Sequence, residues 1–232
     1  LITTKAGYDM WAGPYGDYGS RKYLMASIDQ SLKRLNLDYV DIFYHHRMDK
    51  ETPIEETMFA LADIVKSGKA LYVGVSNYDA EYTEKAVNIL KEQHCPVIVN
   101  QRKYSIFDRT IEADGVKAYC REAGVGIIAY SPLAQGLLSD KYLHGIPKDS
   151  RIARDDRFLH ANDLTEERLE QIRRLNDLAR QRGETLTQMA LSWVLKDEGV
   201  CSVLIGASKP QQIIENTSVV SCAKFTQEEI KM

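Results

Sequence analysis

This chain of 232 residues has no large excess of either positive or negative charge. It carries 30 lysine and arginine residues against 33 aspartate and glutamate residues, which gives a formal net charge of -3. Proteins that bind nucleic acid or an anionic membrane surface usually have a clear basic excess. We therefore predict no nucleic-acid partner and no membrane partner, and expect a small molecule instead.

Long apolar runs and paired cysteines are also missing. No run approaches the roughly 18 apolar residues of a membrane span, and the chain opens with neither methionine nor a signal-peptide pattern. The four cysteines, Cys95, Cys120, Cys201 and Cys222, lie far apart without a C-x-x-C motif, which favours thiols kept reduced. We expect a cytoplasmic protein whose given start, Leu1, is an interior position of a longer chain.

Short β-rich runs alternate with helical patterns along the chain. The runs are LITTK, YVDIFYHH, ALYVGVSN, VIVNQ, GIIAYS and SVLIGAS. Such alternation is typical of βα units on a parallel sheet. A doubly wound sheet usually has a Gly-x-Gly-x-x-Gly turn after its first strand, and this motif does not occur here.

Polar residues stand at the end of almost every predicted strand. They are Lys5, His46, Ser76 with Asn77, Gln101, Ser131 and Ser208. In a (β/α)8 TIM barrel, side chains from the carboxyl ends of the strands meet at one mouth. We therefore predict a single α/β domain over residues 1–232, an incomplete TIM barrel with about six of its eight βα units.

Helix-start signals occupy several of the connections. Thr52, Pro53 and Glu55 form a pattern typical of a capping box, and Thr226 with Glu229 repeats it near the end. Ser20 precedes another helix, whose apolar stripe is predicted to comprise Leu24, Ile28, Leu32 and Leu35. Some 30 residues separate the run GIIAYSPL from a helix near Thr165, and a connection of that length is usually functional or disordered.

The strand ends, taken together with their flanking strings, resemble the aldo-keto reductase superfamily. The strings are TKAGYDMW, SGKALYVGVSNY, AYSPLAQGLLSDKYL and VLIGASKPQQIIEN. These strings are most similar to the branch that holds the potassium-channel β-subunits and the bacterial L-glyceraldehyde 3-phosphate reductases. This resemblance implies NADPH-dependent reduction of an aldehyde or ketone to an alcohol on a TIM barrel.

Two adjacent histidines end the run YVDIFYHH, and strand alternation separates them. Ile42, Tyr44 and His46 share one face, whereas Phe43 and His45 share the other. A metal pair would need a common face, and neither H-x-H nor H-E-x-x-H is present, so we predict no metal site. The resemblance places His46 at the mouth, where it would polarise the substrate carbonyl, and leaves His45 to packing.

Lys5 matches the catalytic lysine of the family. In such sites the ammonium lowers the pKa of a tyrosine, which then acts as general acid. The family's tyrosine and its aspartate partner lie on segments before this strand, and Tyr8, Tyr15 and Tyr18 do not match that tyrosine. We therefore expect two further βα units, roughly 60 residues, to precede Leu1 in the parent protein, and this chain alone to be inactive without them.

The cofactor expected from the resemblance is NADPH. Ser76, Asn77 and Gln101 match residues that bind the nicotinamide carboxamide, because an amide needs donors and acceptors together, and Tyr130 matches the stacking aromatic. In isolation Tyr130 would be interpreted as a core tyrosine, and Gln212, Glu215 and Asn216 as an exposed polar helix face. The remaining predicted cofactor contacts are Ser131, Pro132, Leu133, Gln135, Gly136, Lys141, Arg151, Gly206, Ser208, Gln212, Glu215 and Asn216.

Within that set, the 2′-phosphate of NADPH needs cationic or helix-terminal partners. By resemblance Lys141 and Arg151 face this phosphate, and Ser208, at the start of the helix after the last strand, offers backbone donors. The run SPLAQG, residues 131–136, matches the loop across the pyrophosphate, and the long connection after it resembles a lid.

Substrate recognition is less clearly marked. Trp11 is a candidate wall of the carbonyl pocket or a loop-packing aromatic, and Arg47 either attracts a phosphorylated aldehyde or pairs with Asp49. L-glyceraldehyde 3-phosphate and methylglyoxal are the first candidate substrates. The alternatives are an NADPH-binding, channel-β-like regulatory subunit or redox sensor, where asparagine typically replaces His46, and a truncated barrel that binds nothing. By analogy with this branch, a homo-oligomer, tetrameric or larger, is expected.

Overall fold

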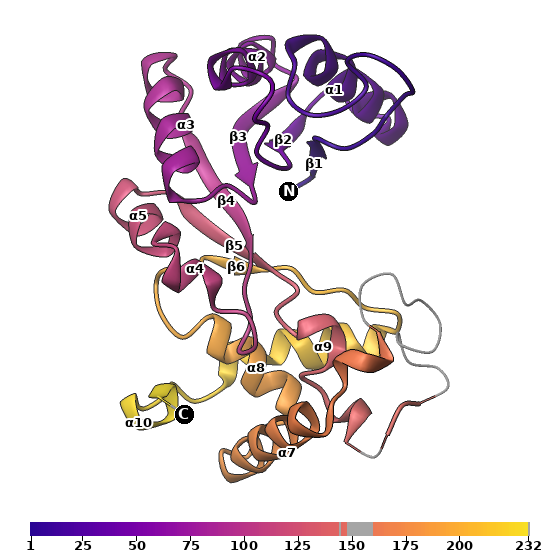
Figure 1. The fold of residues 1–232 in the computed structure, drawn as a ribbon, viewed down its shortest axis with the longest axis vertical. Coiled ribbons are helices and arrows are strands. Elements are labelled where there is room, and N and C mark those ends of the chain that lie inside the picture. Colours follow the sequence, from indigo (N-terminus) through magenta and orange to yellow (C-terminus); the bar gives the residue numbers. More distant parts are fainter. Residues whose placement is uncertain (144, 148–159, 232) are drawn as a thin grey trace. The chain divides into compact units, whose positions relative to one another are not determined.

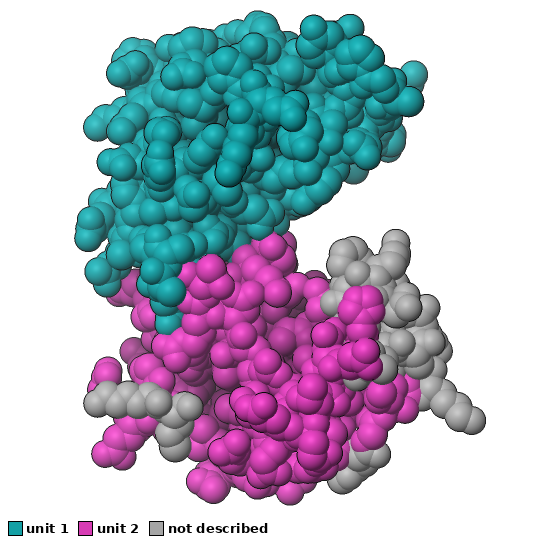
Figure 2. All heavy atoms as spheres, in the orientation of Figure 1, with its two compact units in different colours: residues 1–102, 111–128 teal, residues 103–110, 129–232 magenta. Residues whose placement is uncertain are grey.

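The computed structural model describes residues 1–143, 145–147 and 160–231 of the chain. It divides into two compact units, shown in two colours in Figure 2, which are described separately below. Unit 1 comprises residues 1–102 and 111–128, and unit 2 comprises residues 103–110 and 129–232. The prediction of a single domain remains a prediction.

Six strands follow one another in a sheet of order β1-β2-β3-β4-β5-β6 (Figure 1). Their bounds are β1 Thr3–Ala6, β2 Val40–His45, β3 Ala70–Ser76, β4 Val97–Lys103, β5 Gly126–Tyr130 and β6 Ser202–Val203. The pairs β1 with β2, β2 with β3, and β3 with β4 are parallel. Parallel strands in sequence order, each joined to the next through helical segments, are the βα arrangement that the sequence predicts.

The helices lie in the connections between these strands, apart from α9 and α10, which follow β6. The α-helices are α1 Arg21–Leu35, α2 Ile54–Lys66, α3 Ala80–Glu92, α4 Thr110–Ala113, α5 Val116–Ala123, α7 Glu166–Gln181, α8 Leu186–Val194, α9 Pro210–Thr217 and α10 Gln227–Lys231. Short 3₁₀ turns are η1 Ala134–Gly136, η2 Asp140–Tyr142, η3 Ala161–Asp163 and η4 Ser218–Ser221. No helix among the described residues is long and apolar enough to cross a bilayer.

Inside unit 1, residues on one face of β2 build a small apolar core. Ile42 and Tyr44 pack with Val99 of β4, as expected for alternate residues of a strand. Tyr44 lies against Gly74 of β3, its register partner, where an added Cβ would come within 2.6 Å of the tyrosine ring. Glycine at 74 therefore leaves the space that the ring fills.

Helix starts confirm two of the predicted caps and correct one. The Ser20 side chain accepts a hydrogen bond from the Tyr23 N–H, and Thr226 and Glu229 bond reciprocally. The box at Thr52 is wrong, because α2 begins at Ile54 after Pro53 and has no side-chain cap. The carboxylate of Asp49 accepts the Thr52 N–H instead.

The apolar stripe of α1 is shorter than predicted. Leu24, Ile28 and Leu32 are buried, whereas Leu35 is 44% exposed. Leu35 is the last residue of the helix, and Asn36 follows it in the left-handed conformation that ends α1. The buried stripe therefore ends at Leu32, one turn before the predicted end at Leu35.

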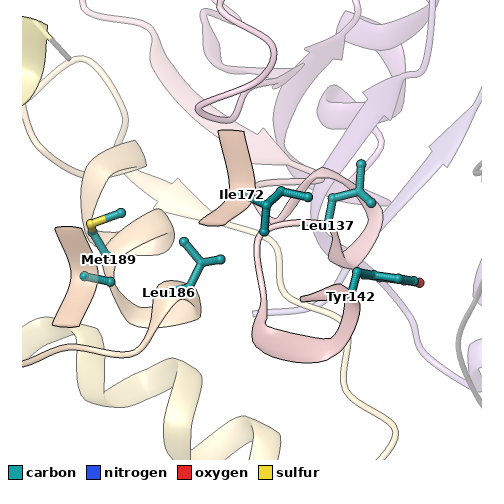
Figure 3. Close-up of a cluster of buried hydrophobic side chains, with 6 residues drawn as sticks. Leu137, Tyr142, Ile172, Leu186 and Met189 are labelled. Atoms are coloured by element: carbon teal, nitrogen blue, oxygen red, sulfur yellow. The ribbon is translucent and has the colours of Figure 1, made fainter. Parts of the chain in front are cut away.

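Unit 2 has a core of its own (Figure 3). Leu137 and Tyr142 from the segment after β5 pack with Ile172 of α7 and with Leu186 and Met189 of α8. Each fully buried side chain of this size contributes about 1.5–3 kcal/mol. The core therefore anchors the start of the long connection, up to Tyr142, against the two helices.

Candidate functional site

Lys5 and His46 lie at the ends of the neighbouring strands β1 and β2. Lys5 is paired with Tyr44, and Ala6 with His45, so that His46 follows directly after the pairing. The Lys5 ammonium lies 4.9 Å from the centre of the Tyr44 ring, and burial lowers the pKa of this lysine. A partly desolvated ammonium keeps a strong local field, which a catalytic lysine requires.

The His46 side chain is partly buried and borders on three groups. Its ring meets that of Tyr8 edge-on, with the centroids 4.8 Å apart and an interplanar angle of 88°. Burial lowers the pKa of His46, and the positive charges of Lys5 and Arg47 lower it further. The imidazole is therefore neutral near pH 7 and retains one N–H to donate to a ligand oxygen.

His45 lies on the opposite face of β2 and is fully buried. Its Nε2–H donates to the Tyr18 carbonyl at 3.2 Å, and the Tyr78 hydroxyl donates to Nδ1 at 2.6 Å. Burial lowers the pKa of His45 to about 4 and raises the pKa of Tyr78. The predicted division is confirmed, with His45 serving as a packed and hydrogen-bonded side chain.

Ser76, Asn77 and Gln101 join the ends of β3 and β4. The Ser76 hydroxyl and the Asn77 N–H both donate to the Gln101 carbonyl, each at 3.0 Å. Asn77 has a left-handed backbone with φ 58°, which asparagine tolerates better than most residues. Its side-chain amide donates to the His46 carbonyl at 3.0 Å, so that these residues form one cluster with the histidine.

The two predicted substrate residues lie in or beside the loop between β1 and α1. Arg47 does not pair with Asp49, as one alternative predicted, but with Asp17 at 2.6 Å. Asp49 instead accepts three backbone N–H bonds, from Gly19, Glu51 and Thr52. Hydrogen bonds satisfy that carboxylate, which explains why the arginine is left for another partner.

Trp11 packs against Tyr23 with the ring centroids 5.8 Å apart, and its indole N–H donates to the Pro14 carbonyl. Its role as a pocket wall stays a prediction. Sequence reasoning missed Tyr8 as the aromatic that contacts His46. A usable signal was present, because Tyr8 stands three residues after the strand-end lysine.

Unit 2 holds a pocket of about 730 Å³. Its walls come from the loop after β5, from η2, from the segment between β6 and α9, and from residues of α8 and α9. The predicted cofactor contacts that line it are Ser131, Pro132, Leu133, Gln135, Gly136, Lys141, Gly206, Ser208, Gln212, Glu215 and Asn216. Segments some 70 residues apart along the chain thus come together around one cavity.

The pocket loop after β5 has an unusual backbone. Ser131, Ala134 and Gln135 adopt positive φ values of 53°, 48° and 61°, and Gly136 has φ 99°. The Gln135 side-chain amide donates to the Ser131 hydroxyl at 3.0 Å, which holds the loop in a tight curl. Clustered left-handed residues other than glycine are uncommon and often mark a ligand clamp.

The turn before α9 is closed by a side chain of the helix itself. The N–H groups of Ser208 and Lys209 donate to the Gln212 side-chain oxygen at 2.8 and 3.1 Å, so these two donors are satisfied within the protein. An added Cβ at Gly206, on the pocket wall, would meet no atom within 4 Å. Gly206 therefore leaves open space beside the start of α9.

Tyr130 is a predicted cofactor contact that does not line this pocket. It ends β5, is partly buried, and its carbonyl accepts the Tyr104 N–H at 3.3 Å. Arg151 lies outside the described residues, as do residues 144 and 148–159 of the connection interpreted as a lid.

Comparisons with known proteins agree with this arrangement. Residues 1–232 match the model of the aldo/keto reductase family. The chain is 54% identical over 233 residues to the L-glyceraldehyde 3-phosphate reductase of Escherichia coli O157:H7, covering 99% of this chain and 67% of that protein. It is 36% identical to a probable voltage-gated potassium channel subunit beta of Oryza sativa subsp. japonica, covering 93% of this chain and 66% of that protein.

A solved structure supports the fold. A thermostable aldo-keto reductase, crystallised with the inhibitor epalrestat, superposes with a TM-score of 0.72 at 31% identity, covering 92% of this chain and 65% of that one. The chain therefore spans about two thirds of the length of these relatives. The prediction of an incomplete (β/α)8 barrel is confirmed by the strand order and by this neighbour.

Proposed function

Because the chain belongs to the aldo/keto reductase family of oxidoreductases, we propose that it forms the larger part of an NADPH-dependent reductase of small aldehydes. L-glyceraldehyde 3-phosphate is the first substrate to test, and methylglyoxal is the second. The proposal rests on the neutral, partly buried His46, which lies beside Tyr8 and in the field of Lys5.

His46 has the chemistry to orient a carbonyl group. A neutral imidazole donates one hydrogen bond to the substrate oxygen and polarises the bond to carbon. The Asn77 amide, bonded to the His46 carbonyl at 3.0 Å, fixes the backbone from which this ring projects. The His46 ring can therefore hold the oxygen of the substrate carbonyl in a defined direction.

Lys5 supplies positive charge where the oxygen becomes negative during reduction. Its pKa is lowered by burial, and the Tyr44 ring 4.9 Å away limits the positions that the ammonium can take. In the proposed reaction this charge stabilises the developing alkoxide.

The cofactor proposed is NADPH, although members of the family generally use NADH or NADPH. When bound, its nicotinamide supplies the hydride to the carbonyl carbon. The unit 2 pocket suits the anionic part of such a molecule, with Lys141 on its wall and open space at Gly206. In unit 1 the buried amide of Gln101 has both a donor and an acceptor, which suits recognition of a carboxamide.

Turnover by the full-length protein tests the proposal. Oxidation of NADPH and of NADH would be followed with L-glyceraldehyde 3-phosphate, methylglyoxal and a nitrobenzaldehyde. We expect turnover with at least one aldehyde, a preference for NADPH, and loss of turnover in His46→Ala. Tight NADPH binding without turnover on all three would overturn the reductase and favour a regulatory subunit like the channel β-subunit relatives.

A further inference from the structure

Arg47 ties both ends of the loop between β1 and α1, residues 7–20. Its Nε donates to the Gly7 carbonyl at 2.6 Å. Its Nη2 donates to the two carboxylate oxygens of Asp17 at 2.7 and 2.6 Å. Since Gly7 opens the loop and Asp17 lies near its end, one guanidinium closes the loop on itself.

The same guanidinium lies near two tyrosine rings. Its central carbon is 4.3 Å from the centre of the Tyr8 ring and 4.2 Å from that of Tyr18. A planar guanidinium stacks on aromatic faces and donates sideways at the same time, which a lysine ammonium does not do. The position is thus specific for arginine.

The end of the loop next to α1 also has two hydrogen bonds that do not involve Arg47. The His45 ring donates to the Tyr18 carbonyl, and the Thr57 hydroxyl donates to the Gly19 carbonyl at 2.9 Å. An added Cβ at Gly19 would lie 2.7 Å from the Thr57 hydroxyl and 2.9 Å from the His45 ring. His45 and Arg47, on either side of His46, therefore both hold this loop.

Arg47 with its bonds to Gly7 and Asp17 is called the Arg47 clamp below. Tyr8 connects this clamp to His46. One contact of its ring is the Arg47 guanidinium, and the other is the edge-on contact with His46. At Gly7, which has φ +148°, an added Cβ would lie 3.0 Å from the His46 Cβ. The backbone before Tyr8 thus runs directly against the histidine.

We propose that Arg47 is a positioning residue for carbonyl reduction, which holds Tyr8 against His46 and so makes Tyr8 one wall of the carbonyl site. The inference rests on the proposed function and goes beyond it. It replaces the expectation that Arg47 recruits a substrate phosphate, since its Nε and Nη2 donors are already used within the protein.

Kinetics of Arg47→Lys and Asp17→Asn in the full-length protein separate the two roles. Positioning predicts that Arg47→Lys lowers kcat by about 10- to 100-fold on phosphorylated and unphosphorylated glyceraldehyde alike, with a smaller loss in Asp17→Asn. The matched control is Arg34→Lys, on the exposed side of α1, which should leave kcat unchanged. A rise in KM for the phosphorylated aldehyde alone, or an unchanged kcat, would overturn the proposal.

A second readout does not depend on turnover. The NMR shift of the His46 ring protons reports on the nearby Tyr8 ring, and Tyr8→Leu gives the reference shift without that ring. Arg47→Lys and Asp17→Asn should both move the His46 signals toward this reference, whereas Arg34→Lys should not. Unmoved signals in variants that melt as the unmodified protein does would refute positioning. Moved signals in a protein without turnover would refute the reductase and keep the Arg47 clamp.

Discussion

The candidate chemical residues in unit 1 and the candidate cofactor residues in unit 2 are held in different ways. At the strand ends of unit 1, polar side chains bond to backbone groups of neighbouring segments: Asn77 to His46, Arg47 to Gly7 and His45 to Tyr18. These bonds cross from strand to strand or from strand to loop. The result is a region whose geometry is fixed before any ligand arrives.

In the unit 2 pocket, the loop after β5 and the start of α9 are held by local side-chain bonds. Gln135 bonds to Ser131, four residues away, and Gln212 bonds to Ser208, also four residues away. Longer-range bonds also reach the wall, from the Leu204 N–H to the Ala129 carbonyl at 2.8 Å and from the Thr185 hydroxyl to Glu215 at 3.2 Å. Segments held by local bonds can rearrange at less cost than a network that spans the sheet. The comparison indicates rigid placement of the candidate chemical residues and a pocket wall that is adaptable at its two locally bonded segments.

Removing Lys5 should have the largest effect and should test whether unit 1 does chemistry. Lys5→Met is expected to lower kcat by about 10²- to 10⁴-fold, the range for loss of a group that assists proton transfer. The melting temperature should hold or rise, because a partly buried charge disappears. Steady-state kinetics and thermal melting check this, with Lys33→Met on exposed α1 as control. A kcat close to that of the control would remove Lys5 from the reaction.

The buried histidine of β2, His45, should affect how the stability of the protein depends on pH. His45 has a folded pKa of about 4, below the ordinary value of about 6.5. The unfolded chain therefore binds a proton between these values while the folded chain does not. The stabilisation by neutral His45 is complete above pH 6.5 and is lost as the pH falls toward 4, by up to about 3 kcal/mol.

His45→Gln keeps polar atoms at this position but removes the titration. Between pH 6.5 and 4, the free energy of unfolding should fall less steeply in this variant than in the unmodified protein, as measured by denaturant unfolding. His94→Asn alters an exposed histidine and serves as the control. Equal slopes for all three proteins would mean that His45 takes up its proton over the same pH range in the folded and the unfolded state.

Lys141 should distinguish the two forms of the cofactor. Lys141→Met is expected to raise the Kd for NADPH by about 10-fold, which corresponds to about 1.4 kcal/mol for one phosphate contact. The Kd for NADH should change little, because it lacks the 2′-phosphate. Fluorescence titration measures both, with the exposed Lys224→Met as control. An equal rise in Kd for NADPH and NADH would show that Lys141 does not contact the 2′-phosphate.

The order of the strands and the separation of the two histidines could be predicted from the sequence. Both depend on periodicity, since residues alternate between faces along a strand. Lys5 and His46 stood out as polar ends of apolar runs. The roles assigned to them and to the pocket residues came from resemblance to a family, because a serine or glutamine in isolation carries no such meaning.

The partners of Arg47 and Asp49 could not be predicted in the same way. Asp17 lies 30 residues before Arg47, and only the folded loop brings them together. Asp49 is near in sequence, but its carboxylate is satisfied by the Gly19, Glu51 and Thr52 N–H groups. Competition for backbone donors decided the pairing, and the same competition removed Thr52 from the expected cap.

The smallest effect is expected at Gln212, where the cap of α9 and the pocket wall coincide. In Gln212→Glu a carboxylate can accept the same Ser208 and Lys209 bonds at a helix N-terminus, which should stabilise the fold by about 0.3–1 kcal/mol. The added negative charge should weaken NADPH binding by about 3- to 5-fold. Gln211→Glu places the same charge on the same turn, away from the pocket lining, and should share the stabilisation without the loss. Equal NADPH affinity in both variants would show that Gln212 does not face the phosphates, and the adaptable wall would then end at Ser208.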